Sequence, residues 1–130
     1  MDIAHAIEAA RAASEKAYAP YSDFRVGAAI LTEGGTVHAG CNVENASYGL
    51  TICAERNATA AMVFADPKDC RIKLAAVVSP NRAPCFPCGA CRQVLNEFGC
   101  EEVVVLEASG EIRRYSLGAL LPNAFSSKSL

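Results

Sequence analysis

The sequence of 130 residues lacks several features that mark whole classes of protein. Neither sign of charge is in excess, because 14 acidic residues against 12 lysines and arginines give a net charge of -2 and a pI near 5.7. A nucleic-acid partner would be expected to need a basic surface, so this balance argues against one. No apolar run approaches the length that spans a bilayer, and we therefore expect no membrane partner.

The first residues also lack the basic stretch followed by an apolar run that marks a secretory signal. Linkers, internal repeats and low-complexity segments are missing as well. A hydrophobic content of 52% with 20% charged residues is typical of a globular protein. We therefore expect one cytoplasmic domain over residues 1–130, which would bury about 65–70% of the surface that its unfolded form exposes.

Cysteine, in contrast, is abundant, with seven residues in a short chain. An odd number excludes complete pairing in disulfides, and a reducing compartment makes pairing unfavourable. Cys41, Cys70 and Cys100 stand alone in the sequence, so we interpret them as small buried hydrophobic residues. The other four cysteines lie close together in two segments and need a different explanation.

The hydrophobic pattern predicts an α/β fold. Helical periodicity or alanine-rich composition marks 2–18, 53–65, 88–98 and 116–121, and apolar runs mark strands at 26–32, 36–42, 74–79, 103–106 and 112–115. Asp2 is predicted to cap the first helix and Pro20 to stop it. The strand–helix–strand order over 74–106 implies a parallel pair. We expect a three-layer α/β/α sandwich with a mixed sheet of about five strands.

Cys53, Cys88 and Cys91 form a candidate metal site. Catalytic zinc uses three protein ligands and keeps its fourth position for water, and Glu55 follows Cys53 where a proton shuttle is needed. Cys53 opens one predicted helix, and the Cys-x-x-Cys pair lies on the first turn of another. Both helix N-termini would then favour thiolates. Arg56 and Arg92 are candidates to offset the negative charge of the cluster.

Cys85 leaves an alternative open. It precedes Cys88 with the same spacing that separates Cys88 from Cys91, so these three cysteines and Cys53 are also compatible with a closed structural zinc site. Such a protein would be a zinc-stapled binding domain, for which Glu55 is dispensable. We favour Cys53 with Glu55 as the functional pair and interpret Cys85 as a bystander in the loop.

Six segments resemble those of the small, homotetrameric cytidine deaminases over nearly the whole chain. They are Tyr18-Ala19-Pro20-Tyr21-Ser22, Phe24-Arg25-Val26-Gly27-Ala28-Ala29, Gly40-Cys41-Asn42-Val43-Glu44-Asn45-Ala46-Ser47-Tyr48, Cys53-Ala54-Glu55-Arg56, Pro87-Cys88-Gly89-Ala90-Cys91-Arg92-Gln93-Val94 and Leu120-Leu121-Pro122-Asn123-Ala124-Phe125. The resemblance implies one zinc ion per subunit and deamination of cytidine and 2′-deoxycytidine in pyrimidine salvage. It also implies hydroxide attack on C4 of the base, with Glu55 carrying the protons.

The same resemblance assigns residues to the substrate. Asn42 and Glu44 alternate on an extended segment, so their side chains would share one side, and the family match places both on the ribose 3′-hydroxyl. Without that match, a turn-forming asparagine and a solvated glutamate would be the commoner explanation. Phe24 would stack on the base, and the backbone near Ala54 and Cys88 would meet its polar edge.

Tyr48 and Phe125 correspond to residues that reach into a neighbouring subunit in this family, so a monomer would lack a complete site. A rival deaminase of a cytosine analogue such as blasticidin S would not be expected to carry the Asn-Val-Glu-Asn segment at 42–45. Deaminases of free cytosine, nucleotides or tRNA usually present histidine where this chain has Cys53. These features favour a nucleoside as the substrate.

Overall fold

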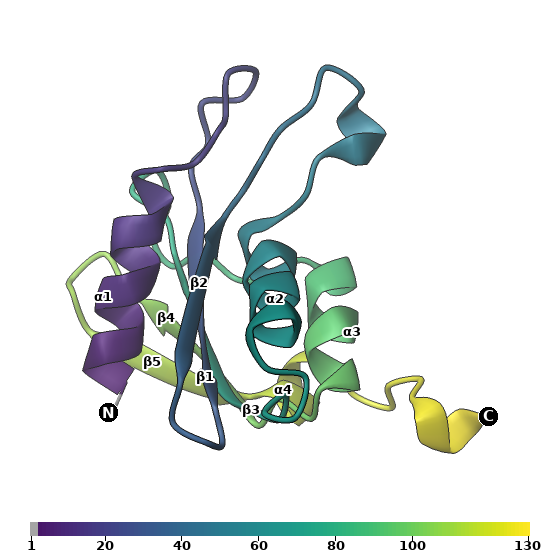
Figure 1. The fold of residues 1–130 in the computed structure, drawn as a ribbon. Helices are drawn as coiled ribbons and strands as arrows, with labels where there is room; N and C mark the ends of the chain where they lie inside the picture. The colour runs from purple at the N-terminus through teal and green to yellow at the C-terminus, as the bar shows by residue number, and fades with distance from the viewer. Residues whose placement is uncertain (1–2) are drawn as a thin grey trace.

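The computed structural model describes residues 3–130, and its elements follow the predicted order (Figure 1). They are α1 (Ile3–Ser14), β1 (Gly27–Thr32), β2 (Val37–Cys41), α2 (Ala54–Ala65), β3 (Ile72–Val78), α3 (Gly89–Glu97), β4 (Glu102–Leu106), β5 (Ile112–Ser116) and α4 (Leu117–Leu120). Short 3-10 turns lie at Tyr48–Leu50 and Ser127–Ser129. The Asp2 cap predicted for the first helix lies outside the described residues.

The five strands form one mixed sheet in the order β2-β1-β3-β4-β5. β1 is antiparallel to both β2 and β3, and β4 is antiparallel to β5. β3 and β4 are parallel, as the strand–helix–strand pattern predicts, because α3 carries the chain back to the start of β4.

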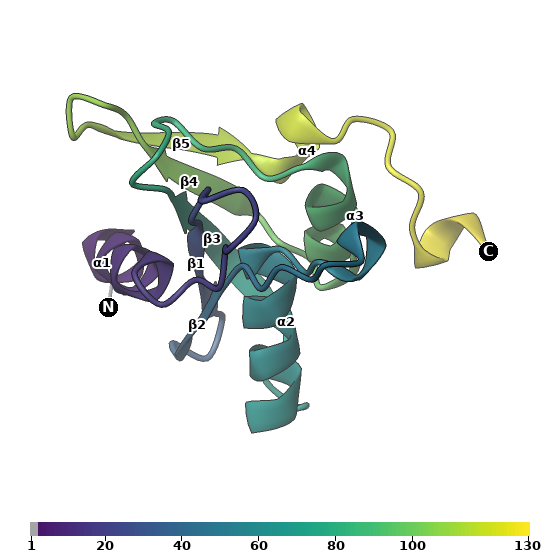
Figure 2. The ribbon, with the colours of Figure 1, turned by 90° about the horizontal axis from the view of Figure 1, so that it is seen from above.

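Helices cover both faces of this sheet, α1 on one side and α2 with α3 on the other (Figures 1 and 2). Alternation along β1 divides its side chains between the two layers. Ala28 and Ile30 belong to the core that includes α2 and α3, whereas Ala29 and Leu31 pack with α1. The predicted three-layer α/β/α sandwich is confirmed.

The first helix is shorter than predicted. It ends at Ser14 instead of residue 18, although its alanine-rich pattern continues. Tyr18 leaves the helix because its backbone pairs with the segment after β2: its N–H donates to the carbonyl of Asn42 at 3.0 Å, and its carbonyl accepts from Glu44 N–H at 2.8 Å. Backbone pairing between distant segments therefore outcompetes the local helical preference.

Gly40 on β2 lets α2 lie directly against the edge of the sheet. A Cβ atom at this position would lie 2.5 Å from the amide nitrogen of Ala58 and 2.9 Å from the carbonyl oxygen of Ala54. Both distances are shorter than van der Waals contact, so only glycine permits this separation of helix and strand. The contact involves the first turns of α2, which follow directly on Cys53.

All seven cysteines are free thiols. Cys100 is buried, whereas Cys41 and Cys70 are half-buried, so the prediction of buried hydrophobic cysteines holds fully only for the first. Cys41 ends β2, which is an edge strand, and Cys70 lies in the turn before β3. Within residues 3–130, no helix has the length and apolar character that crossing a membrane requires.

Candidate metal centre

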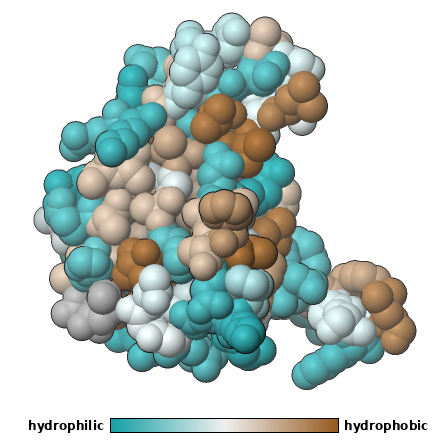
Figure 3. Space-filling view, viewed as in Figure 1, coloured by the Kyte–Doolittle hydropathy of each residue, from teal (hydrophilic) through white to brown (hydrophobic). Residues whose placement is uncertain are grey.

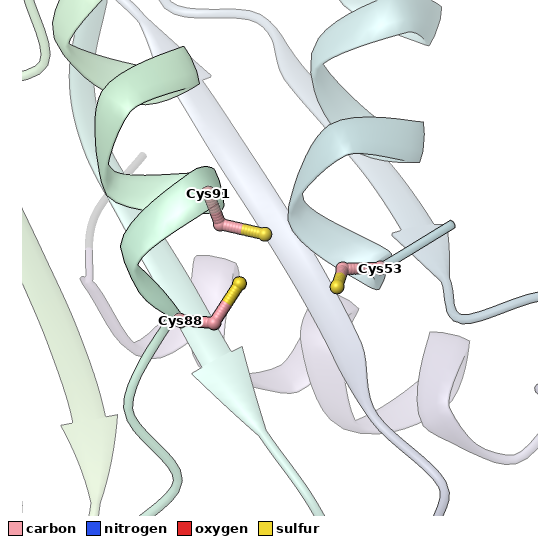
Figure 4. Close-up of side chains that lie close together, drawn as sticks. All are labelled: Cys53, Cys88 and Cys91. Carbon is pink, nitrogen blue, oxygen red and sulfur yellow. The ribbon is translucent and has the colours of Figure 1, made fainter. Parts of the chain in front are cut away.

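Three sulfur atoms meet where α2 and α3 begin. Cys53 is the N-cap residue of α2, Cys88 is the N-cap residue of α3, and Cys91 follows on the first turn of α3. Their Sγ atoms all lie within 4.8 Å of one another. Figure 4 shows the three side chains directed into the same space between the two helices. The predicted convergence of two helix N-termini is therefore observed.

The donor set fits zinc. Zinc binds thiolate sulfur at about 2.3 Å, and three Sγ atoms within 4.8 Å of one another are close enough to share one ion. Partial positive charge at the two helix N-termini stabilises thiolates in this position. Three sulfur ligands leave the fourth coordination position for water, which is the arrangement of catalytic zinc sites.

Charge in this cluster is arranged around Cys53. The Cys91 thiol donates a hydrogen bond that lowers the pKa of Cys53, and the same bond raises the pKa of Cys91. Arg56 lies one turn along α2, with its Nη2 atom 3.4 Å from Cys53 Sγ. Its Nε atom is buried without a partner among the described residues, so the guanidinium retains donor capacity toward further negative charge.

Glu55 lies beside the three sulfur atoms and is 4% exposed. Burial raises the pKa of this carboxyl to about 7, a bond from its own backbone opposes the rise, and the negative charge of Cys53 adds to it. A carboxyl group with a pKa near neutrality gives and takes protons at physiological pH. Glu55 therefore has the environment that a proton shuttle needs.

Cys85 does not belong to the sulfur group. Its side chain is buried, and burial together with the charge of Glu55 raises the pKa of its thiol to about 11. The geometry thus favours a three-cysteine site with an open position over the closed four-cysteine site.

A hollow of about 200 Å³, here called the inner hollow, opens beside the cluster. It gathers most of the residues predicted for the base: it is lined by Phe24, Val26, Asn42, Thr51, Cys53, Ala54, Glu55, Cys85, Phe86 and Cys88. Sequence reasoning missed Val26, Thr51 and Phe86. Phe86 carries a visible signal, since an aromatic residue stands two positions before Cys88, but no periodicity marks it as a pocket residue.

Asn42 and Glu44 lie in different hollows. Asn42 is buried, its Oδ1 accepts from Val26 N–H at 2.9 Å, and its Nδ2 donates to the Phe24 carbonyl at 2.8 Å. Glu44 lies in a second hollow of about 390 Å³, here called the outer hollow, which also includes Tyr21, Ser22, Asn45 and Tyr48. Thr51 lines both hollows, so the two spaces adjoin.

Glu44 is fixed by the segment after α1. Its Oε1 atom accepts from the backbone N–H groups of Tyr21 at 3.0 Å and Ser22 at 3.1 Å, and its Oε2 atom accepts from the Ser22 hydroxyl. The Ser22 hydroxyl bond is the largest cause that lowers the pKa of Glu44. This carboxylate is therefore negatively charged and oriented without any ligand.

The two aromatic residues predicted to serve a neighbouring subunit project into solvent. Tyr48 is 76% exposed and its ring packs edge-to-face against Tyr21, and Phe125 is 62% exposed. Gln93 on α3 donates to the Phe125 carbonyl at 2.8 Å and ties down the start of the C-terminal segment. The rest of this segment stands away from the body of the molecule (Figures 1 and 3).

The Arg92 guanidinium is held by backbone carbonyl groups on either side of α3. Its Nε atom donates to the Pro87 carbonyl at 2.8 Å and its Nη1 atom to the Leu120 carbonyl at 2.8 Å. The guanidinium thus connects α3 with α4 and with the residue before Cys88. Arg56 contacts a cluster sulfur atom, whereas Arg92 braces the helix that carries two of them.

A buried carboxyl with a pKa near neutrality, placed beside three sulfur ligands that leave a zinc position open, belongs to enzymes that activate water. Fold and site together define a zinc-dependent enzyme of the α/β/α class. Comparison with known proteins names the family. The model of the cytidine and deoxycytidylate deaminase zinc-binding region matches residues 2–107. The chain belongs to this family.

Individual relatives agree with that assignment. A cytidine deaminase of Sporosarcina psychrophila is 44% identical over 132 residues, which cover 100% of this chain and 96% of the relative. A cytidine deaminase crystal structure from Burkholderia pseudomallei is 52% identical with a TM-score of 0.87, over 96% of this chain and 100% of that one. The structure of the Mycobacterium tuberculosis cytidine deaminase is 42% identical with a TM-score of 0.83, over 96% and 98%.

Proposed function

We propose that this protein hydrolyses cytidine and 2′-deoxycytidine to uridine and 2′-deoxyuridine with release of ammonia. The observation that carries the proposal is the position of Glu55. This buried carboxyl lines the same small hollow as Phe24, Cys53 and Cys88, so a planar base in that hollow lies within reach of both the proton shuttle and the zinc ligands. The relatives named above carry the same activity in their names.

Cys53, Cys88 and Cys91 would hold one zinc ion, which when bound supplies a Lewis acid that lowers the pKa of a water molecule. Glu55 takes a proton from the attacking water and delivers it to N3 of the base, which makes C4 electrophilic. Glu55 then takes the second proton from the new hydroxyl group on C4 and gives it to the amino group. The C4–N4 bond breaks, which leaves the C4 carbonyl of uridine and releases ammonia. Burial matches the proton affinity of Glu55 to these transfers by raising its pKa to about 7. Arg56 stabilises the negative charge of the sulfur cluster.

Substrate orientation follows from the lining of the two hollows. The Phe24 ring stacks on the base, and the backbone at Ala54 meets the polar edge of the base. The remaining hydrogen-bonding capacity of Asn42 and the oriented carboxylate of Glu44 are directed to the ribose 3′-hydroxyl. Because the inner and outer hollows adjoin at Thr51, one nucleoside can occupy both.

We further propose that a homotetramer completes the site. Tyr48 and Phe125 are exposed in a single chain, although exposed aromatic rings of this size gain free energy when a partner covers them. In the assembly, they would reach the pocket of a neighbouring subunit.

The single domain predicted over residues 1–130 and a role in pyrimidine salvage belong to the same proposal. A cytoplasmic location is supported by the need for three reduced zinc ligands.

The decisive experiment mixes the zinc-loaded protein with cytidine and follows the ultraviolet absorbance change as uridine forms. The parent is expected to convert cytidine. Glu55→Gln should retain zinc and the melting temperature while losing about 10²–10⁴-fold in kcat, because the amide cannot transfer the protons. A folded, zinc-loaded parent that leaves cytidine unchanged contradicts the substrate assignment and directs the assay to cytosine and blasticidin S.

Cys85→Ser is the matched control for the metal assignment. The three-cysteine site predicts one zinc ion per chain and activity within about twofold of the parent, since serine preserves the size of the side chain. A zinc-free, inactive Cys85→Ser protein would instead establish Cys85 as a ligand. That outcome would favour the zinc-stapled binding domain.

A further inference from the structure

A third hollow of about 480 Å³, here called the side hollow, lies next to the inner hollow. Three residues line both of them, namely Phe24, Cys85 and Phe86. Residues common to two adjoining spaces form the partition between them. Two of the three are aromatic, so the inner hollow is bounded on this side mainly by rings.

Phe86 is the less expected of the two rings. It lies in the loop between β3 and α3 and is 38% exposed, which leaves part of its surface open to a ligand. Tyr115 on β5 holds the Phe86 ring edge-to-face, with ring centroids 5.2 Å apart and an interplanar angle of 70°. Tyr115 itself packs against the core beneath α2 and α3, so a residue of the sheet fixes the ring of a loop residue.

We propose that Phe86 is a substrate-positioning residue, whose ring forms with Phe24 the aromatic wall of the base pocket and is held in place by Tyr115. This inference rests on the proposed function, since it assigns the ring to the base of a nucleoside. A pyrimidine presents planar faces that associate favourably with aromatic side chains. Phe86 makes no proton transfer, and it acts by fixing the base in front of Glu55.

The first test compares KM and kcat for cytidine in Phe86→Leu and Phe86→Ala, with bound zinc measured in each protein. Leucine preserves apolar bulk without a ring face, so it remains informative where alanine destabilises the loop. Loss of a stacking partner is expected to raise KM about five- to tenfold while kcat stays within about twofold, the pattern of lost uniform binding. Phe86→Tyr retains the ring and should keep the KM of the parent.

A parent-like KM in zinc-loaded Phe86→Leu would overturn the proposal for Phe86. The proposed function would still stand, provided that the parent converts cytidine. Loss of zinc together with kcat would also overturn it, because the ring would then only support the loop that carries Cys88. Failure of the parent to convert cytidine is a separate result, which concerns the proposed function.

Tyr115 supplies the second test. Tyr115→Leu should raise KM by less than Phe86→Leu does, and Tyr115→Phe should leave KM unchanged because the edge-to-face contact survives. In the Phe86→Leu background, Tyr115→Leu should add nothing, since the ring that it orients is gone. An undiminished effect of Tyr115→Leu in that background would refute the anchoring role.

Discussion

The inner and outer hollows are built from different kinds of structure. On its metal side the inner hollow is lined by the N-termini of α2 and α3, and the sulfur cluster beside it is formed within one chain. The outer hollow is lined by the segments after α1 and β2, and Tyr48, the more exposed of its two tyrosines, is 76% exposed. The proposed chemistry thus lies on helix N-termini, whereas the proposed recognition of the sugar lies on loops, which the proposed neighbouring subunit would complete.

The largest effect is expected from a substitution in the sulfur cluster beside the inner hollow. Cys91→Ser replaces a fully buried sulfur ligand by a hydroxyl, which binds zinc poorly. We expect zinc content to fall from one per chain toward zero and kcat/KM to fall by more than about 100-fold. Elemental analysis and the cytidine assay measure both. Cys70→Ser, at a half-buried thiol outside the cluster, should retain zinc and activity.

Asn42 lines the inner hollow and hydrogen-bonds the backbone on both sides of Arg25, so its removal should lower stability. Asn42→Ala leaves the N–H of Val26 and the carbonyl of Phe24 without their partner. The free energy of unfolding, measured with urea, is expected to fall by about 1–3 kcal/mol. Asn45→Ala, at an exposed position on the same segment, should change it by less than about 0.5 kcal/mol. Equal effects of the two variants would show that the Asn42 amide does not support the wall of the pocket.

Glu44→Gln changes the outer hollow and leaves the inner hollow and the sulfur cluster intact. The amide keeps the size of the side chain but weakens a charged hydrogen bond to the sugar, so kcat/KM for cytidine is expected to fall about tenfold. Zinc content should stay at one per chain. Glu111→Gln removes an exposed carboxylate elsewhere and should leave kinetics unchanged. Parent-like kinetics of Glu44→Gln would remove Glu44 from the binding site.

The smallest effect is a pH dependence of stability. Bonds from Ser22 lower the pKa of Glu44 below its usual 4.5, so its contribution is present above pH 4.5 and is lost as pH falls through the folded-state pKa. The difference in melting temperature between parent and Glu44→Gln should therefore shrink between pH 6 and pH 3. A constant difference over this range would mean that the carboxylate charge contributes nothing to the fold.

Prediction from sequence succeeds where local signals and packing agree. Cys53 and Cys88 precede helical patterns, which predicts their positions at helix N-termini, and the zinc-site interpretation of the three cysteines predicts that their sulfur atoms meet. The predicted end of the first helix was wrong because the backbone of Tyr18 pairs with a segment that only folding brings near it. Alternation placed Asn42 and Glu44 on one side, and no pattern revealed that their hydrogen bonds direct them into separate hollows.

Phe86 is a pocket residue that sequence patterns did not identify. It lies in an irregular loop, and its ring packs edge-to-face against Tyr115, which is 29 positions later in the sequence and belongs to the far edge strand. Hydrophobic periodicity carries no information about such a pairing. Residues held by contacts between distant elements are therefore the ones that sequence reasoning misses.

Gly40 gives the site a dependence on a residue that lines neither the inner nor the outer hollow. The single hydrogen atom of its side chain sets how closely α2 approaches β2, and Cys53 and Glu55 lie at the start of that helix. An added methyl group would push the helix outward and move both functional groups away from the sulfur atoms on α3. Redesign of this site for other nucleosides would therefore have to keep glycine at position 40, although this residue lines neither hollow.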